Sequence, residues 1–480
     1  MDAVRTALIW SLAERYASLV VTVVSTMILA RLLTPGQIGI FSMCAAVTAV
    51  AGILRDFGIS EYLIQEKDLN KEKIRAALGI ALLMAWSIGA TIFFSRHYIA
   101  DFYQEKGIAE VLTVLTLNFL LLPFASPSAA LLNRDMAFRK VFAVQTTSTL
   151  VHAVTAVALA YNGYGYMSLA WAQVIGITTQ ILVLAVLRPD GTMLLPSLKE
   201  AKAVLQYGSM FATSRLIETF TRNAHEFVVA RQFGFAAVGL FSRSFGLIEL
   251  FYTNVASAVL RVATPSFASD HRAGLNLAAS FSRGTAIITS IAWPFFGFIA
   301  LMSADIVRVL FGSQWDAAAP IATILALTVM PAYLYALGPN ILAATGHVKT
   351  RLRISLIFSP VHLLGIVLGS FISLFAVAAV WFVTNSLMLV LYIYHLRRVL
   401  KATAQTLFTP SLNSIAAAGF SIAAQAITQF ACRQAGLIPL VDLIFVAASG
   451  GAAWLFAVWM LKHPAFDEIT RLLPRRNLPK

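Results

Sequence analysis

Apolar runs of about 20 residues dominate this chain and limit what it can fold into. We find about fourteen such runs, each long enough for an apolar helix to cross a bilayer. Hydrophobic residues make up 59% of the 480 positions and charged residues only 12%, whereas soluble domains carry about 25% charged residues. The sequence therefore predicts an all-α polytopic membrane protein with about fourteen transmembrane helices, two of them over residues 207–230 and 237–262.

Lysine and arginine are distributed unevenly between the predicted loops. Most of the 36 basic residues fall in alternate loops when the N-terminus is placed inside the cell. The positive-inside rule expects this asymmetry, so we predict that both termini are cytoplasmic. The net charge of +14 then reflects membrane topology, and we expect no nucleic-acid partner. Both cysteines lie in or beside apolar runs, so neither a disulfide nor a metal site is expected.

A phrase near the N-terminus recurs in the second half of the chain. Residues 30–42 read ARLLTPGQIGIFS, and residues 230–242 read ARQFGFAAVGLFS. Six predicted helices separate the copies, so both have the same orientation in the membrane. The chain is therefore predicted to contain two parallel six-helix repeats followed by two further helices. We predict an N-terminal lobe over 1–190, a C-terminal lobe over 200–400, and two extra helices with a basic cytoplasmic tail over 401–480.

The repeated phrase is interpreted as the outer turn between the first two helices of each lobe. Gly39 and Gly239 begin the returning helices, where a small residue permits close helix approach. Arg31 and Arg231 are expected to cap helix ends.

Prolines recur in the fourth helix of each predicted lobe, at 123 and 127 and at 331 and 339. Interrupted helices at matching positions indicate a transport path. Simple proline kinks are the alternative.

The helices that precede the phrase carry polar residues on one face. Positions three, four or seven apart share a face of a helix, and Arg15 aligns with Arg215 in the second copy. A charge at the bilayer centre costs about 3 kcal/mol, so this face is expected to line a hydrated cavity. The alternative is a self-paired ladder, in which Arg222 pairs with Glu218 and Glu226 four residues away.

Two sets of candidate site residues follow from this face and from the next helix. Arg243 and Glu249 are six residues apart, so each is expected to find its partner on another helix. The candidate substrate-binding residues are Arg15, Arg215, Arg222, Asn223 and Arg243. The candidate ion-coupling residues are Glu14, Glu218, His225, Glu226 and Glu249.

Enzyme motifs do not explain the sequence. It contains no G-x-x-x-x-G-K-[ST] P-loop, and the HEFVV segment at 225–229 lacks the second histidine of a zinc protease. A membrane-embedded polymerase or glycosyltransferase would be expected to place carboxylates in an outer loop, and the first outer loop, LLTPGQ, has none. We therefore expect no enzyme activity, no cofactor and no metal.

Five segments in combination resemble one transporter family. They are ARLLTPGQIGIFSMCAAVTAVAGILRDFGISEYLIQEKD (30–68), RDMAFRK (134–140), TRNAHEFVVARQFGFAAVGLFSRSFGL (221–247), RVATPSFAS (261–269) and ADIVRVLFGSQWDAAAPIATILAL (304–327). They are similar to the Wzx-type lipopolysaccharide and exopolysaccharide flippases. These form the polysaccharide branch of the multidrug/oligosaccharidyl-lipid/polysaccharide superfamily.

The resemblance implies two six-helix lobes around a central cavity. It also implies flipping of undecaprenyl-diphosphate-linked oligosaccharide across the bacterial inner membrane by alternating access, for exopolysaccharide or lipopolysaccharide biosynthesis. Its expected partners are the lipid-linked glycan, membrane lipid, and polysaccharide polymerase and export proteins. Related flippases use cavity arginines for the diphosphate, and the matching residues here are Arg15, Arg215 and Arg222.

One departure from the family concerns ion coupling. Where the family often reads N-x-D-N, this chain has Asn223-Ala224-His225-Glu226, so Glu226 would have to supply the carboxylate. An ion-coupled multidrug exporter of the same superfamily stays open, because the predicted intramembrane charges are four arginines against four glutamates.

Overall fold

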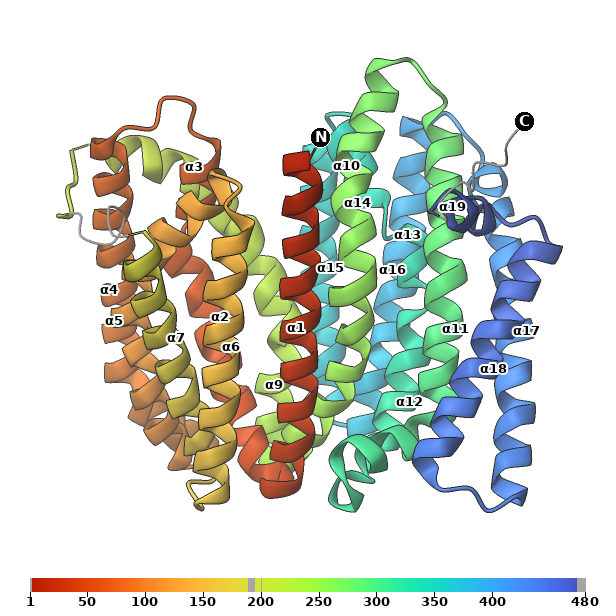
Figure 1. The fold of residues 1–480 in the computed structure, drawn as a ribbon, viewed down its shortest axis with the longest axis horizontal. Coiled ribbons are helices and arrows are strands. Elements are labelled where there is room, and N and C mark those ends of the chain that lie inside the picture. The colour runs from red at the N-terminus through yellow and green to blue at the C-terminus, as the bar shows by residue number, and fades with distance from the viewer. Residues whose placement is uncertain (1, 189–194, 200, 473–480) are drawn as a thin grey trace. The chain divides into compact units, whose positions relative to one another are not determined.

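The computed structural model describes residues 2–188, 195–199 and 201–472, and every regular element in these ranges is helical (Figure 1). Within these described ranges, thirteen helices are long and apolar enough to cross a membrane. The predicted all-α polytopic fold is thus confirmed.

The chain forms two compact units, Met1–Gly239 and Leu240–Lys480. In the first unit, α4 packs on α5, α5 on α7, and α6 on both α7 and α1. Its helices are α1 (Asp2–Leu32), α2 (Pro35–Asp56), α3 (Ile59–Gln65), α4 (Lys71–Tyr103), α5 (Gly107–Arg134), α6 (Phe138–Tyr161), α7 (Met167–Leu187) and the first part of α9 (Ala201–Phe251).

In the second unit, α11 packs on α12, α17 and α18, while α15 packs on α16. After the last part of α9, its elements are η1 (Tyr252–Ala256), α10 (Ser257–Arg272), α11 (Leu277–Phe311), η2 (Ser313–Trp315), α12 (Ala318–Val329), α13 (Ala332–Tyr335), α14 (Gly338–Ala344), α15 (Val348–Ser370), α16 (Leu374–Val399), α17 (Ala404–Gln434), α18 (Pro439–Met460) and α19 (Pro464–Leu472).

The boundary between the compact units lies at Gly239, later than the predicted lobe boundary between residues 190 and 200. The first part of α9 belongs to the first unit because it packs there, as the hydrogen bond from Tyr103 Oη to the carbonyl oxygen of Phe227 illustrates (3.3 Å). The predicted lobes follow the sequence repeat, whereas the compact units follow the packing of the helices. The lobes over 1–190 and 200–400 and the region 401–480 therefore stay a prediction.

A glycine divides the longest helical span of the protein. Residues Arg215–Arg272 form one span of 58 residues, which is about 87 Å at 1.5 Å per residue and far exceeds a hydrocarbon layer of about 30 Å. Gly234 interrupts this span with φ 78° and ψ 176°, a conformation that only glycine adopts readily. The span thus supplies two passes joined at Gly234, so the thirteen helices provide the fourteen predicted crossings.

The two copies of the repeated phrase touch each other through glycine. A Cβ atom on Gly39 would collide with the carbonyl oxygen of Phe235, and one on Gly239 would collide with the carbonyl oxygen of Pro35. Positions 35 and 235 are equivalent in the repeat, as are 39 and 239, so the contact is reciprocal like that across a twofold axis. The predicted close helix approach at these glycines is confirmed.

The helix ends in this region are capped as the residues suggest. Thr34 and Gln37 form a reciprocal capping box at the start of α2, which satisfies backbone N–H groups that have no partner within the helix. Arg31 Nη1 donates to the carbonyl oxygen of Met27 inside α1 (3.2 Å), and its predicted capping role stays a prediction. Arg231 instead lies over the ring of Phe102, 5.5 Å from its centroid.

The proline-bearing helices of the two halves differ in structure. Pro123 and Pro127 lie inside the continuous helix α5. The corresponding segment of the second half is divided into α12, α13 and α14, with Pro331 immediately before α13 and Pro339 at the start of α14. The predicted interruption therefore forms in the second half, and the prolines of the first half do not end their helix.

A buried histidine fixes the start of α19. His463 is fully buried, and its Nδ1 accepts a hydrogen bond from the backbone N–H of Ala465 (3.1 Å). Its Nε2 lies 3.0 Å from Ser414 Oγ on α17, and Thr289 Oγ1 of α11 donates to the same oxygen (3.0 Å). The start of α19 is thus held against the membrane-spanning helices α11 and α17.

Candidate functional site

The predicted polar face of α9 is partly exposed and partly buried. Arg215, Glu218 and Arg222 are exposed, whereas His225 and Glu226, one turn further along, are buried. Because positions 215, 218 and 222 are three and four apart, they form one exposed stripe along the helix. A membrane-spanning helix of the first unit thus presents two guanidinium groups and one carboxylate outside the packed core.

Arg215 is joined to a residue that the sequence did not single out. Its Nη1 lies 2.8 Å from Glu61 Oε1 on α3. Glu61 follows Phe57 and Gly58, both in the left-handed region, where α2 ends and α3 begins. The sequence signal that could have identified Glu61 was its position shortly after Gly58, within the family-like segment 30–68. The pair brings α3 and α9 together at the candidate site.

His225 and Glu226 form a buried acid–imidazole pair. His225 Nε2 lies 3.5 Å from Glu226 Oε1, and Glu226 is only 7% exposed. Within the described ranges, Glu226 Oε2 has no hydrogen-bond partner, and burying a polar atom without a partner costs free energy. Arg215–Glu61 and His225–Glu226 are two contacts of α9 in the first unit that the sequence did not predict, and the ladder around Arg222 stays a prediction.

The remaining first-unit candidates lie on α1 and α9. Glu14 and Arg15 are half-buried on α1, which packs against α6. Asn223 Nδ2 donates to the carbonyl oxygen of Thr219 one turn earlier (2.8 Å). The functional roles of Glu14, Arg15 and Asn223 stay a prediction.

Arg243 and Glu249 lie in the second compact unit, apart from the residues above. The Arg243 guanidinium lies 5.8 Å from the ring centroids of both Phe311 and Trp315. These rings come from α11 and η2, so Arg243 finds its partners on other elements, as expected from its spacing. Cation–π contacts of this kind favour a structural role that fixes the buried Trp315.

A small depression next to Arg55 adds polar groups that sequence reasoning missed. Its lining includes Arg55, Asp56, Ser60, Pro123 and Ser126. Arg55 Nη2 is 2.8 Å from Asp56 Oδ1. Pro123 has no N–H to give to the preceding turn of α5, so a backbone carbonyl is available close to this charged pair.

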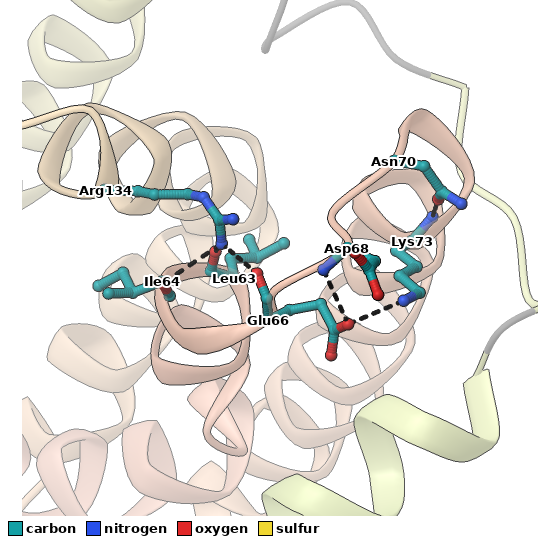
Figure 2. Close-up of polar contacts among 7 residues, drawn as sticks. All are labelled: Leu63, Ile64, Glu66, Asp68, Asn70, Lys73 and Arg134. Carbon is teal, nitrogen blue, oxygen red and sulfur yellow. Dashed lines mark hydrogen bonds and ion pairs between the residues drawn. The ribbon is translucent and has the colours of Figure 1, made fainter.

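The family-like segment RDMAFRK is explained by the cluster in Figure 2. Arg134 Nη1 donates to the carbonyl oxygens of Leu63 (2.8 Å), Ile64 (3.3 Å) and Glu66 (2.6 Å), at and just beyond the end of α3. These are carbonyls that a helix end leaves without partners. Arg134 therefore holds the end of α5 against the end of α3, which positions Glu61 on the same short helix.

The same cluster has a second part around Glu66 (Figure 2). Its carboxylate accepts hydrogen bonds from Lys73 Nζ (2.8 Å) and the backbone N–H of Asp68 (3.4 Å). The Lys73 hydrogen bond lowers the pKa of Glu66 below its usual value. The arrangement orders the loop between α3 and α4.

The family-like segment 304–327 is also structural. Arg308 donates from Nε and Nη2 to both carboxylate oxygens of Asp316 (2.8–3.1 Å), which lowers the pKa of Asp316. Trp315 is fully buried beside them. In the part of the chain that the structure describes, no three His, Cys, Asp or Glu side chains are grouped so as to hold a metal ion.

Comparison with solved structures identifies the fold. The chain is similar to the lipid II flippase MurJ in an inward closed conformation, with a TM-score of 0.76, 14% identity, and coverage of 97% of this chain and 100% of that one. It is also similar to an inward-facing MATE multidrug resistance transporter, with a TM-score of 0.62, 14% identity, and coverage of 81% and 96%.

Curated relatives are distant and named for polysaccharide biosynthesis. Lipopolysaccharide biosynthesis protein WzxC of Escherichia coli is 21% identical over 66% of this chain and 65% of its own length, just under two thirds. Teichuronic acid biosynthesis protein TuaB of Bacillus subtilis is 20% identical over 93% of both chains. Succinoglycan biosynthesis transport protein ExoT of Rhizobium meliloti is 24% identical over 66% of this chain and 65% of its own.

A family model described as "Polysaccharide biosynthesis protein" matches residues 28–320. This range covers more than half of the chain, from the first outer turn through the buried pair on α9 to the start of α12. The chain therefore belongs to this family of polysaccharide biosynthesis proteins.

Proposed function

We propose that this protein flips undecaprenyl-diphosphate-linked oligosaccharide from the inner to the outer leaflet of the bacterial inner membrane, for exopolysaccharide or lipopolysaccharide biosynthesis. Support comes from its family, from relatives named for lipopolysaccharide, teichuronic acid and succinoglycan, and from a fold shared with a lipid II flippase.

The observation that carries the proposal is the exposed cationic stripe of α9. Arg215 and Arg222 are exposed on a membrane-spanning helix, where a charge in contact with hydrocarbon would cost about 3 kcal/mol or more. A hydrated path that accepts an anionic headgroup removes this cost. Guanidinium groups bind phosphate oxygens through charge-assisted hydrogen bonds, so a diphosphate fits them. Arg15 and Asn223 would also bind the substrate at this site. Arg243 is the candidate substrate-binding residue of the second unit.

The proposed mechanism is alternating access. The diphosphate and first sugars bind the arginines on one side of the membrane, while the lipid tail stays in the bilayer. A change in the relative orientation of the lobes then exposes the headgroup on the other side. Polar path residues replace water around the headgroup, because its bare transfer through hydrocarbon is prohibitive.

We assign ion coupling to the buried pair on α9. A buried carboxylate with an oxygen that no protein group hydrogen-bonds can accept a coupling cation that reaches it along the transport path. Glu226 and His225 have this arrangement. Glu218 and Glu249, also on α9, and Glu14 on α1 are further candidates for ion coupling.

We place both termini in the cytoplasm and expect polysaccharide polymerase and export proteins as functional partners. The basic residues of alternate loops support this topology. Reporter fusions at residue 480 test it, since a cytoplasmic reporter should be active and a periplasmic one inactive. The opposite result would reverse the topology.

Deletion of the gene tests the proposed function. Lipid-linked repeat units should accumulate in the cytoplasmic leaflet, and export of the polysaccharide should stop. A deletion strain that still exports its polysaccharide would overturn the proposal.

Arg222→Ala tests the binding stripe. Loss of its charged hydrogen bonds, worth about 1.5–3 kcal/mol, should reduce export about ten- to a hundredfold at unchanged protein level, while Arg222→Lys should retain part of it. Arg231→Ala is the matched control, because Arg231 is an exposed cation on the same helix outside the stripe. Equal export by Arg222→Ala and wild type would remove Arg222 from the site.

A second candidate function is ion-coupled multidrug export. It is favoured by the likeness to a MATE transporter fold and by the balance of arginine and glutamate among the candidate residues. Drug susceptibility separates the two functions, because only an exporter of cationic drugs should make its deletion strain hypersensitive while polysaccharide export continues.

A further inference from the structure

A long part of the second unit contains cations and no carboxylate. No aspartate or glutamate occurs between Asp316 and Asp442, a stretch that includes α12 to α17. Six of its seven lysines and arginines lie at the start of α15 or around the end of α16. We call these six the basic patch: Lys349, Arg351, Arg353, Arg397, Arg398 and Lys401.

The fold brings the two halves of the basic patch to one end of a helix pair. α15 and α16 pack against each other and are joined by a short turn, so the start of α15 and the end of α16 lie at the same end. Arg353 and Arg398 both act electrostatically on His395, which places them close to one another. All six cations of the patch are exposed.

Exposed apolar side chains continue from the basic patch along both helices. On α15, Leu356 and Ile357 lie three or four residues after Arg353, on the same face. On α16, Tyr394 lies four residues before Arg398, and Val390 lies four residues before Tyr394. The Arg398 guanidinium lies 4.1 Å from the Tyr394 ring centroid. Each apolar face therefore ends in guanidinium groups, the order in which a phospholipid presents its acyl chains and its phosphate.

Several cations outside the basic patch pair with carboxylates. In the first unit Lys73 pairs with Glu66, and Arg188 pairs with Asp135. In the second unit, Asp270 accepts a hydrogen bond from Ser280, and Asp467 and Glu468 pair with Arg283. The positive-inside rule explains the sign of the basic patch, but not the convergence of its cations without a carboxylate.

We infer that the basic patch binds the phosphate of an anionic phospholipid in the cytoplasmic leaflet, with the acyl chains along the exposed faces of α15 and α16. Cations clustered at the cytoplasmic ends of membrane helices recognise such headgroups. The bound lipid is a resident of the membrane and not the transported substrate. The inference therefore does not depend on the proposed function.

Lipid binding to the purified full-length protein tests this inference. The protein in neutral detergent is titrated with phosphatidylglycerol or phosphatidylcholine, and bound lipid is counted by native mass spectrometry. Wild type should bind phosphatidylglycerol more tightly. The Arg353→Gln/Arg397→Gln/Arg398→Gln variant should lose about a hundredfold in affinity, and Arg397→Gln alone about fivefold. The single variant keeps the test valid if the triple variant does not fold.

The matched control removes three exposed cations from the first unit. Lys67→Gln/Lys71→Gln/Lys199→Gln loses the same charge, and it should keep the affinity of wild type. An equal loss in both triple variants would show non-specific attraction and overturn the inference, as would full binding by the patch variants. If the patch variants lost undecaprenyl diphosphate and kept phosphatidylglycerol, the occupant would be the isoprenoid diphosphate, and the inference would be wrong.

Discussion

The fourth helix of the first half and its counterpart in the second half share a sequence signal and differ in structure. α5 contains two prolines and stays one helix from Gly107 to Arg134. The counterpart is divided into α12, α13 and α14. Two prolines are thus compatible with either outcome.

The neighbours of the helix explain the difference. Asn385 on α16 bridges the interruption, because its Nδ2 donates to the carbonyl oxygen of Thr328 (3.1 Å) and its Oδ1 accepts from Tyr335 Oη (2.9 Å). Trp293 Nε1 of α11 donates to the carbonyl oxygen of Met330 (3.1 Å). A proline removes a backbone hydrogen bond, and here side chains from other helices satisfy the carbonyls that the interruption leaves. In a membrane such partners are required.

The repeated phrase differs from the proline-bearing helices, because its glycine contacts are alike in both halves. Gly39 and Gly239 make the same contact with the equivalent residue of the other copy. The repeat is therefore preserved where backbone meets backbone and has diverged where side chains decide the path of a helix.

Gly39→Val and Gly239→Val should have the largest effects, and the effects should be equal. A side chain at either position meets a backbone carbonyl, which cannot move aside as a side chain can. Overpacking costs about 1–3 kcal/mol in an adaptable core, and more is expected here. Membrane-inserted protein and polysaccharide export in a complemented deletion strain are the measurements.

Gly36→Val and Gly246→Val are the controls for this pair, since a Cβ at either position meets nothing within 4 Å. If Gly239→Val were tolerated and Gly39→Val were not, the two contacts would not be equivalent, and the reciprocal arrangement would be refuted.

Asn385→Leu should destabilise the second unit by about 1–3 kcal/mol, because a buried carbonyl and a hydroxyl lose their partner. Pro123→Ala in the continuous helix α5 should have a smaller effect, since it adds an N–H where the helix already continues. The midpoint of thermal unfolding in detergent measures both. A larger loss in Pro123→Ala would show that proline, rather than the neighbours, determines the path of these helices.

His463 immediately precedes α19, and its burial should make stability depend on pH. Burial lowers its pKa below the usual 6.5, so the unfolded chain binds a proton more readily than the folded one. The stability contributed by neutral His463 is therefore present above pH 6.5 and lost as the pH falls toward its folded pKa, by at most about 1.4 kcal/mol per pH unit.

The unfolding midpoint of wild type and His463→Gln, measured between pH 8 and pH 5, checks this expectation. The unfolding midpoint of the variant should fall less on acidification than that of wild type. Parallel curves for the two proteins would show that His463 does not contribute to the pH dependence.

Asp316→Asn should have the smallest effect. The Arg308–Asp316 pair is exposed and bidentate, and exposed pairs contribute little because water and salt screen them. We expect unchanged export and an unfolding midpoint close to that of wild type, with any difference abolished by high salt. A loss comparable to that of Asn385→Leu would show that this motif has a role beyond ordering the loop.

Much of the fold could be predicted from the sequence, and little of the site's geometry could. The apolar runs predicted the crossings, including the two that meet at Gly234. The spacing of Arg215, Glu218 and Arg222 predicted a shared face, and the structure exposes all three on one stripe. The partner of Arg215 was missed, because Glu61 lies far away in the sequence and in a predicted loop. The contacts of Arg215 with Glu61 and of Glu226 with His225 were not predicted, and the ladder around Arg222 stays a prediction.

What the sequence determined by itself was the number of the crossings, the repeat, and the close approach at Gly39 and Gly239. These follow from local properties: the length of apolar runs, the recurrence of one phrase, and the absence of a side chain. The tertiary structure alone decided which proline-bearing helix is interrupted, which carboxylate meets Arg215, and which cations converge without one. These depend on groups distant in sequence, because a backbone carbonyl or a charge inside a membrane takes the partner that packing brings within reach.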